Sequence, residues 1–454
     1  TAGLVIEFKG ESHTIPLIQA VKIPIIGTTY QMAEPQTLEN EINSVMERMI
    51  GINKAIGFLA SHGSLSVSPD QLAMMQGRRD EAVKAFSGLI SRRYTIKHVD
   101  LAQEGIPEGL NCLIIPRPTQ KFTDYELFQI DQALMKGTSI AFISDMFQQV
   151  AMQQRGMGLP PRFLPIDTGL EKLLKHYGIQ IEKGYVLDQE CYKSQTPPEM
   201  GGGQQDIYFA PVLKNDRINT RPAFMNNIKG LVAIQIAPLS LVTDNIDPDR
   251  VTATRLLRSS EKSWLMDSNI TLNPPMIHPP SGADAFKSFD LAYLLEGEFT
   301  SYFKGKAIPE KEDKKKADPA APGGQAVPKP AADSKPAAPV AAQSRVIETS
   351  KPARIFVLPS SAMIQDTVLD PQGRSMNSVF ILNIIDHLNQ DDGMAVLRAK
   401  QQTLNPIMET TPVMRTIIKA FNIAGLPVLV VLFGLGVLVK RSGRKKKLAS
   451  RFNA

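Results

Sequence analysis

Two pairs of polar residues stand where an α/β sheet would present them for chemistry. Ser61 and His62 directly follow one short apolar segment, and Ser144 and Asp145 follow another. Because open α/β sheets bind ligands outside the carboxyl ends of their strands, these four residues are predicted to form a ligand-binding site. The alternative interpretation is that both pairs are ordinary turn residues with no ligand.

Motifs for catalysis, metal binding or cofactor binding are missing from the sequence. It contains no GxxxxGK[ST] phosphate-binding loop, no HExxH zinc motif and no GxSxG nucleophile elbow. Cys112 lies inside an apolar run and is expected to be a buried, inert thiol, whereas Cys191 lies in a polar stretch. The run Gly201–Gly203 is expected to be a loop. No catalytic residue, cofactor or metal is therefore predicted.

The positive charge of the chain is concentrated at one end. The 454 residues carry a net charge of +6, but residues 440–454 hold seven Lys or Arg and no acidic residue, which leaves −1 for residues 1–439. A folded basic face is thus not expected, and nucleic acid is excluded as a predicted partner. Six of the basic residues are predicted to set membrane topology: Lys440, Arg441, Arg444, Lys445, Lys446 and Lys447.

An uncharged run of 20 residues, from Ala420 through Pro427 to Val439, precedes this basic end. At about 1.5 Å rise per residue it is long enough to cross a hydrocarbon core of about 30 Å. The alternative, a buried core helix, is disfavoured by the flanking charges. We therefore predict a membrane anchor over 413–440 and a basic cytoplasmic tail over 441–454, with lipid as a partner.

The positive-inside rule then predicts the location of the rest of the chain. The large domain is expected in the periplasm of a bacterium, and the anchor in the inner (cytoplasmic) membrane. A translocated domain needs an export signal or an earlier span, and the chain opens on Thr1 followed almost at once by a strand-like stretch. We expect the natural N-terminus to lie outside this sequence, as a single anchor or as a fused permease.

The elements that would position the four polar residues follow an alternating pattern. Residues 1–51 are predicted to form a hairpin (4–8 and 14–18) and a helix capped by Thr37, and residues 52–305 an α/β body. Within the body, strands are expected at 55–60, 94–99, 111–115, 139–143 and 185–187, and shorter antiparallel strands over 205–270. Ser68, Thr123 and Thr168 each begin a helix-capping pattern. Strands spaced by helices predict a mainly parallel sheet covered on both faces, with antiparallel extensions.

A segment of unusual composition interrupts this pattern. Residues 306–352 are rich in Ala, Pro and Lys, which predicts a flexible linker. Residues 353–405 then supply a strand at 353–358 and a helix capped by Asn377, with Val379, Leu382, Ile385 and Leu388 facing inward. The simplest interpretation is that this β–α element returns to the main sheet.

Several stretches together resemble a known family. They are Ser259–Trp264 (SSEKSW), Leu291–Gly305 (LAYLLEGEFTSYFKG), Ile143–Asp145 after a helix ended by Gly137, and Asn377–Lys400 followed by one membrane helix. The chain is thereby identified as a member of the GldG-like family, auxiliary components of a bacterial ABC-type transport system named for gliding motility. The resemblance implies a flavodoxin-like or amidotransferase-like sheet, related to a module of intraflagellar transport proteins. It also implies an ABC-2 type permease and a separate cytoplasmic ATPase as partners, and it carries over no catalytic residue.

The leading hypothesis is a non-enzymatic, membrane-anchored auxiliary subunit that binds a substrate or a partner protein in the periplasm, with a homo- or hetero-oligomer as a compatible assembly. One alternative is a periplasmic enzyme that processes a sugar or an amide on an amidotransferase-like sheet. Another is a scaffold or ligand sensor without a role in transport. Transported substrate, direction and stoichiometry do not follow from the sequence.

Overall fold

The computed structural model describes most of the chain outside several gaps. The described residues are 3–8, 11–23, 27–32, 38, 42, 45–46, 54–67, 83–150, 153–154, 157–158, 161–195, 202–311, 345–394, 396, 398 and 412–452. The predicted helix capped by Thr37, the capping pattern at Ser68, the loop at Gly201 and most of the predicted linker lie wholly or largely outside these residues. Contacts divide the chain into two units, 1–401 and 402–454.

The N-terminal segment forms two antiparallel hairpins. β1 (Gly3–Phe8) pairs with β2 (Glu11–Pro16), and β3 (Ile18–Ile23) pairs with β4 (Gly27–Met32). The predicted first hairpin is confirmed, although its second strand begins and ends earlier than expected. Pro16 ends that strand because proline lacks the N–H that would continue the ladder.

A nine-stranded mixed sheet forms the centre of the first unit, with strand order β13-β18-β21-β22-β8-β7-β5-β6 and β19 paired to β21. The strands β6, β5, β7, β8 and β22 are mutually parallel. Their bounds are Thr95–Val99, Ala55–Leu59, Leu110–Pro116, Ser139–Ile143 and Ala353–Leu358. Numbered along the chain, this half has the order 2-1-3-4-5, so the direction of winding reverses between β5 and β7.

The inner strands of the parallel half are continuous apolar runs because helices cover both of their faces. Ile114 and Phe356 pack into one core cluster together with residues of α3 (Lys84–Ser91) and α6 (Met376–Leu388). The sheet neighbours of these residues point the other way, into a second cluster with α4 (Asp124–Met135) and α5 (Leu170–His176). The predicted two-faced burial is therefore observed.

Local hydrogen bonds explain where the helices begin. Thr123 caps α4 in a complete capping box with Glu126, as predicted. The prediction for Thr168 is wrong in detail, because α5 begins after Gly169, whose left-handed φ of 85° provides the turn. Thr168 still accepts from the N–H of Leu170 and donates to Glu171.

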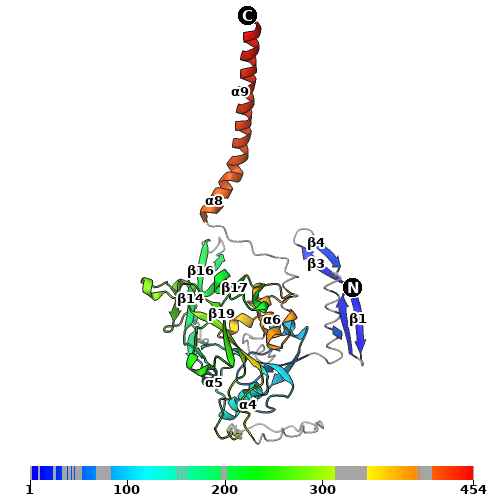
Figure 1. Ribbon diagram of the computed structural model, residues 1–454, viewed down its shortest axis with the longest axis vertical. Coiled ribbons are helices and arrows are strands. Elements are labelled where there is room, and N and C mark those ends of the chain that lie inside the picture. Colours follow the sequence, from blue (N-terminus) through cyan, green and yellow to red (C-terminus); the bar gives the residue numbers. More distant parts are fainter. Residues whose placement is uncertain are drawn as a thin grey trace. The chain divides into compact units, whose positions relative to one another are not determined.

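Asn377 is not the cap of α6, contrary to the prediction. Ser375 is the N-cap and accepts from the N–H of Ser378 at 3.2 Å. The amide of Asn377 instead exchanges two hydrogen bonds with the backbone of Val232, at 2.8 and 3.2 Å, which fastens α6 to β17 (Gly230–Val232) beside it (Figure 1). An internal polar residue of the helix therefore binds a neighbouring strand.

The antiparallel half of the main sheet is built from later parts of the chain. It contains β13 (Ile179–Ile181), β18 (Leu239–Leu241), β19 (Val251–Arg258) and β21 (Asp290–Gly297), and β21 pairs antiparallel with β22. The expected antiparallel extension after residue 205 is confirmed.

Smaller sheets flank this half. The expectation that residues 185–187 continue the main series is wrong, because β14 (Tyr185–Asp188) pairs antiparallel with β20 (Ser263–Met266) in a sheet of its own. The other small sheets are β15 (Cys191–Gln195) with β16 (Gln204–Lys214) and β17, β9 (Phe147–Val150) with β12 (Arg162–Pro165), and β10 (Gln153–Gln154) with β11 (Met157–Gly158). Short 3-10 helices lie at Asn215–Arg217, Ala223–Met225, Thr243–Asn245, Pro274–Met276, Ala283–Ala285 and Ser361–Ile364.

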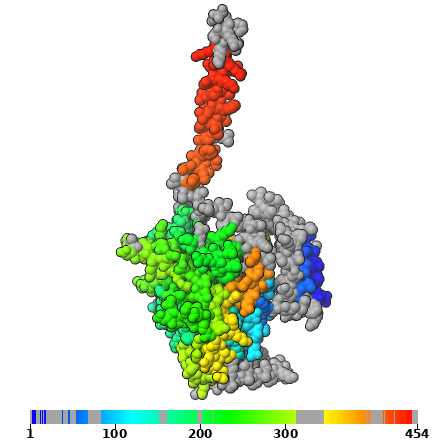
Figure 2. All heavy atoms as spheres, viewed as in Figure 1, coloured from blue at the N-terminus to red at the C-terminus, as the bar shows by residue number. Residues whose placement is uncertain are grey.

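The second unit is helical and contains the predicted anchor. α8 (Pro412–Ala420) passes through a π-helical turn (Phe421–Gly425) into α9 (Leu426–Phe452). Pro427 lacks an N–H and its ring crowds the preceding turn, which accounts for the widened turn just before it. Residues 416–446 form the one helix in the described chain that is long and apolar enough to cross a membrane, and Figure 2 shows this segment as a single column of side chains.

Candidate functional site

The carboxyl end of β5 holds His62 in a closely bonded arrangement. Its imidazole stacks on Phe122 at 4.0 Å between ring centroids, and Nε2 lies 3.0 Å from Oε2 of Glu126. The side chain of Ser61 lies 2.9 Å from Nδ1. His62 is only 8% exposed and has a φ of 60°. The carbonyl of His62 accepts from the N–H groups of Thr119 and Gln120, which joins the loop after β5 to the loop after β7.

The electrostatics of this arrangement determine the tautomer of His62. Burial pushes the pKa of Glu126 upward, but hydrogen bonds from Thr123 and His62 outweigh burial and lower it. Glu126 is therefore a carboxylate, which can only accept, so Nε2 of His62 carries a proton. In the neutral ring Nδ1 is then the acceptor, and the Ser61 hydroxyl donates to it. Both ring nitrogens of His62 thus have a partner.

The second predicted pair, after β8, is bonded to the loop after β22. Asp145 accepts from the N–H of Ser361 at 2.7 Å and from its hydroxyl at 2.6 Å. Ser144 donates its N–H to the carbonyl of Leu358. Ser144 does not have the positive φ that a nucleophile elbow imposes, whereas His62 and Arg117 do.

The two predicted pairs lie on strands that are not neighbours, because β7 separates β5 from β8. Beside Ser144 and Asp145 there is a cavity of about 10 Å³, which Pro118, Thr168 and Glu171 also line. That is the space of one water-sized sphere. One carboxylate oxygen of Glu171 is buried with no hydrogen-bond partner, which suits a single water there. A ligand site formed by Ser61, His62, Ser144 and Asp145 remains a prediction.

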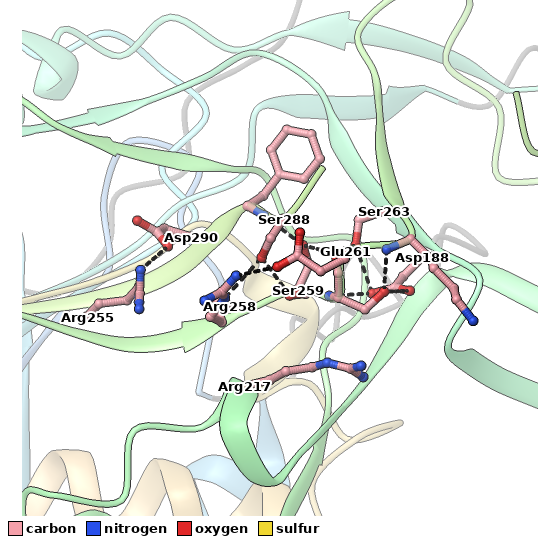
Figure 3. A network of polar contacts seen from close by, with 12 residues as sticks. Asp188, Arg217, Arg255, Arg258, Ser259, Glu261, Ser263, Ser288 and Asp290 are labelled. Atoms are coloured by element: carbon pink, nitrogen blue, oxygen red, sulfur yellow. Dashed lines mark hydrogen bonds and ion pairs between the residues drawn. The ribbon is translucent and has the colours of Figure 1, made fainter. Parts of the chain in front are cut away.

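Residues that sequence reasoning missed form two buried clusters around single carboxylates. Asp188, at the end of β14, is 0% exposed. It accepts from the N–H and hydroxyl of Ser260, from the hydroxyl of Ser263 and from the N–H of Glu190, at 2.6 to 2.9 Å (Figure 3). Two serines of the SSEKSW stretch, Ser260 and Ser263, therefore supply most of the donors to this carboxylate, and they attach the connection between β19 and β20 to β14.

Further contacts extend from the Asp188 cluster toward the surface. The Ser259 hydroxyl accepts from the N–H of Phe289, and Ser288 donates to the carbonyl of Ser259. Arg258 binds Ser288 and Glu261 (Figure 3). Buried positions here use hydroxyls and amides, and charged pairs appear only where the side chains reach solvent.

Asp131, in the middle of α4, forms the second cluster and is also 0% exposed. It accepts from the hydroxyls of Tyr177 and Ser301, the N–H of Tyr302 and the amide of Gln132, at 2.5 to 2.9 Å. Burial, with Asp131 beside it, raises the pKa of Tyr177, which keeps the phenol protonated as a donor. Ser301 and Tyr302 belong to the LAYLLEGEFTSYFKG stretch, so both motif stretches act on buried carboxylates.

A larger hollow lies at the opposite, amino edge of the parallel strands. It has a volume of about 360 Å³, and its lining includes Glu296, Arg354 and Gln390. Glu296 bonds to Nε of Arg354 at 3.0 Å and to Nε2 of His387 at 2.9 Å, and Nδ1 of His387 lies 2.5 Å from Asp392. The hydrogen bond from His387, followed by the charges of His387 and Arg354, lowers the pKa of Glu296. This charged network attaches the C-terminal end of α6 to β21 and β22.

Both cysteines are buried and free. Burial raises the pKa of Cys112, and it raises that of Cys191 to about 11. Neither thiol is therefore activated as a nucleophile. In the described residues no group of three or more His, Cys, Asp or Glu side chains is arranged to hold a metal ion.

The arrangement as a whole is that of a mixed α/β domain in which the buried carboxylates Asp131 and Asp188 are hydrogen-bonded within the fold. The family model described as an ABC-type uncharacterized transport system matches residues 53–384, well over half of the chain. The chain belongs to this family of auxiliary components of ABC-type transport systems, which confirms the family predicted from the sequence.

Two other comparisons add little. No curated protein matches the chain. A solved structure described as the mmIFT52 N-terminal domain is similar at 14% identity, covers 75% of this chain and 99% of its own, and has a TM-score of 0.40. A likeness this remote carries no inference about function.

Proposed function

We propose that this protein is a non-enzymatic, membrane-anchored auxiliary subunit of an ABC-2 type transporter. The observation that carries the proposal is the combination of family membership over residues 53–384 with one long apolar helix followed by basic residues. The permease would share the membrane with this helix, and a separate ATPase would supply the energy.

The proposed topology follows from the charges around the helix. The cluster from Lys440 to Lys447 keeps its side cytoplasmic, and the α/β unit lies in the periplasm. Protease added to spheroplasts should digest the α/β unit and leave a C-terminal tag intact. If the protease digested the tag and left the α/β unit intact, the topology would be the opposite of the one proposed.

For the α/β unit we propose binding of a partner protein at the carboxyl edge of a flavodoxin-like parallel half. The strand order 2-1-3-4-5 is that of flavodoxin-like sheets, whose switch point corresponds to the reversal between β5 and β7. Pockets for small molecules usually measure about 300–1,000 Å³. The cavity of about 10 Å³ beside Asp145 is far smaller, which favours a surface contact through the partly exposed Ser61 and Asp145, with the buried His62 and Ser144 positioned behind them.

Copurification from the native membrane in mild detergent tests the assignment. A C-terminally tagged full chain should retain a permease and an ATPase, identified by mass spectrometry. Val431→Arg combined with Leu432→Arg should move the chain out of the membrane fraction and lose both partners. A wild-type chain that retains neither partner would overturn the assignment.

A bulky substitution at the edge tests the proposed contact. Ser61→Trp should weaken retention of the partners, whereas Ser268→Trp, on an exposed turn of the same unit, should not. If both variants retained the permease and the ATPase equally, the carboxyl edge would not be part of the interface. The family assignment would not be affected.

A further inference from the structure

The helical unit is longer than a bilayer requires. Its candidate span covers 31 residues, from Thr416 to Lys446. At about 1.5 Å rise per residue that is about 46 Å, against about 30 Å of hydrocarbon. The uncharged run from Ala420 to Val439 accounts for the hydrocarbon by itself. Most of α8 (Pro412–Ala420) therefore precedes the part of the helix that the hydrocarbon needs, on the side away from the basic cluster.

The exposed side chains of α8 divide into two faces. Ile417 and Ile418 are 56% and 45% exposed, and Phe421, which follows directly, is 70% exposed. Thr416 and Lys419 lie on the other side of the same turns. In water these three large apolar side chains would be exposed at a free-energy cost, because apolar surface is stabilised when it is removed from water. A helix with one apolar and one polar face instead suits the boundary between headgroups and acyl chains.

The junction with α9 allows α8 to change direction. The backbone between the two helices is π-helical over Phe421–Gly425, and Pro427 removes one hydrogen bond of the next turn. Sharp helix bends occur at such places. α8 can thus lie along the surface while α9 crosses the bilayer.

Charge supports a lipid partner for this surface. No acidic residue occurs from Thr410 to the end of the chain, and Arg415 and Lys419 both fall in α8. A basic, amphipathic helix next to a span is attracted electrostatically to phosphate-bearing headgroups.

We infer that α8 is an interfacial helix, which seats Ile417, Ile418 and Phe421 in the outer-leaflet interface and holds Lys419 at the headgroups. The inference rests on the proposed membrane anchoring of α9. It adds a lipid-binding surface to the helical unit, directly before the span in sequence.

Spin-label accessibility in vesicles tests the inference. Both natural cysteines, Cys112 and Cys191, are replaced by Ala in the full chain, and a nitroxide is attached to one of T416C, I417C, I418C, K419C or V431C. The chain is reconstituted into vesicles of phosphatidylcholine and phosphatidylglycerol. Collision with oxygen, which concentrates in the hydrocarbon, is compared with collision with a water-soluble nickel chelate.

The expected result is alternation along α8. Labels at 417 and 418 should favour oxygen over nickel by several-fold relative to labels at 416 and 419. Nickel access at all four positions would place α8 in water, and oxygen access at all four would make it part of the span. Low access of both reagents at 417 and 418 would indicate protein packing; each of these three results overturns the inference.

The label at 431 separates this inference from the anchoring on which it rests. High oxygen access at 431 without alternation at 416–419 would reject only the interfacial helix. Nickel access at 431 would reject the anchor and the interfacial helix together. Unchanged far-ultraviolet circular dichroism of each labelled chain shows that the substitutions leave the fold intact.

Discussion

The buried carboxylates and the amino-edge network stabilise charge in opposite ways. Asp131 and Asp188 are inaccessible to solvent, and the hydrogen bonds described above come to them from hydroxyls and amides, with no cation among these donors. Glu296, which is partly exposed, is matched by His387 and Arg354. The two deeply buried carboxylates depend on several short contacts with neutral donors, whereas the partly exposed Glu296 depends on two basic side chains, Arg354 and His387.

This difference predicts that the free energy of unfolding lost on substitution becomes smaller as the substituted side chain becomes more exposed to solvent. It also gives a reason for the two serine-containing stretches that mark the family. Ser260, Ser263 and Ser301 are small hydroxyl donors at positions where a larger residue would not fit against a carboxylate. They maintain the fold, and their presence says little about what the protein binds.

The largest effect is expected for Asp188→Ala. The substitution leaves the hydroxyl and N–H donors around Asp188 buried without an acceptor, and each such donor typically costs about 1–3 kcal/mol. Urea unfolding of the full chain in mild detergent measures the change in the free energy of unfolding. Asp188→Asn keeps the shape and should cost less. If Asp188→Ala lowered the free energy of unfolding no more than a surface substitution does, buried carboxylates would not matter more than exposed ones, contrary to this prediction.

A smaller loss is expected for Tyr177→Phe. The change removes one of the donors to Asp131 and leaves the ring packed against Phe299. A hydrogen bond to a charged group is worth about 1.5–3 kcal/mol. Tyr125→Phe is the matched control on the outer side of α4. Equal unfolding free energies for the two variants would show that the Asp131 cluster does not depend on this hydroxyl.

At the amino edge, Glu296→Gln should cost about 1 kcal/mol at neutral pH, in the range of partly exposed ion pairs. The folded-state pKa of Glu296 is lowered, chiefly by the hydrogen bond from His387. Its contribution is therefore complete above the unfolded-state pKa of about 4.3 and disappears as the pH falls through the lower, folded-state value.

The pH dependence separates this group from simple packing. The difference in unfolding free energy between wild type and Glu296→Gln should narrow as the pH is lowered from 7 to below 4. A difference that stays constant over this range would assign the effect of the substitution to packing and not to charge.

The smallest effect is expected for Glu261→Ala. Its contact with Arg258 at 2.7 Å joins a largely exposed carboxylate to a partly exposed guanidinium. Such pairs contribute about 0.2–1 kcal/mol and are screened by salt. Thermal unfolding at low and high salt should show a small difference that vanishes at high salt. If Glu261→Ala lowered the stability as much as Tyr177→Phe does, the predicted dependence of stability loss on side-chain exposure would be wrong.

Much of the fold could be predicted because local patterns and tertiary structure agree. The apolar runs at 139–143 and 353–358 are strands with those bounds, and the Thr123–Glu126 pattern is a capping box. The predictions failed where a side chain acts at long range. Asn377 resembles a cap but binds Val232, and Tyr185–Asp188 resembles another parallel strand but pairs with β20.

The polar clusters were harder to predict for the same reason. Asp131 lies in the middle of a helix, where an acidic residue usually faces water, and its donors Tyr177 and Ser301 are far away in sequence. The serine-containing stretches were noticed as family motifs, but nothing local indicated which carboxylate they contact. At the carboxyl edge, residue types and strand ends predicted where Ser61 and Asp145 lie, and could not predict that closed loops leave a cavity of only about 10 Å³.

The position of β22 has a consequence for biosynthesis. This strand lies between β8 and β21, yet the chain reaches it only at Ala353–Leu358. A ribosome that has produced everything up to residue 350 has therefore made two half-sheets that lack their shared central strand, each with an open apolar edge. Until that strand emerges the nascent chain must be shielded from aggregation, and a premature stop codon shortly before 353 would yield a product far less soluble than its near-complete length suggests.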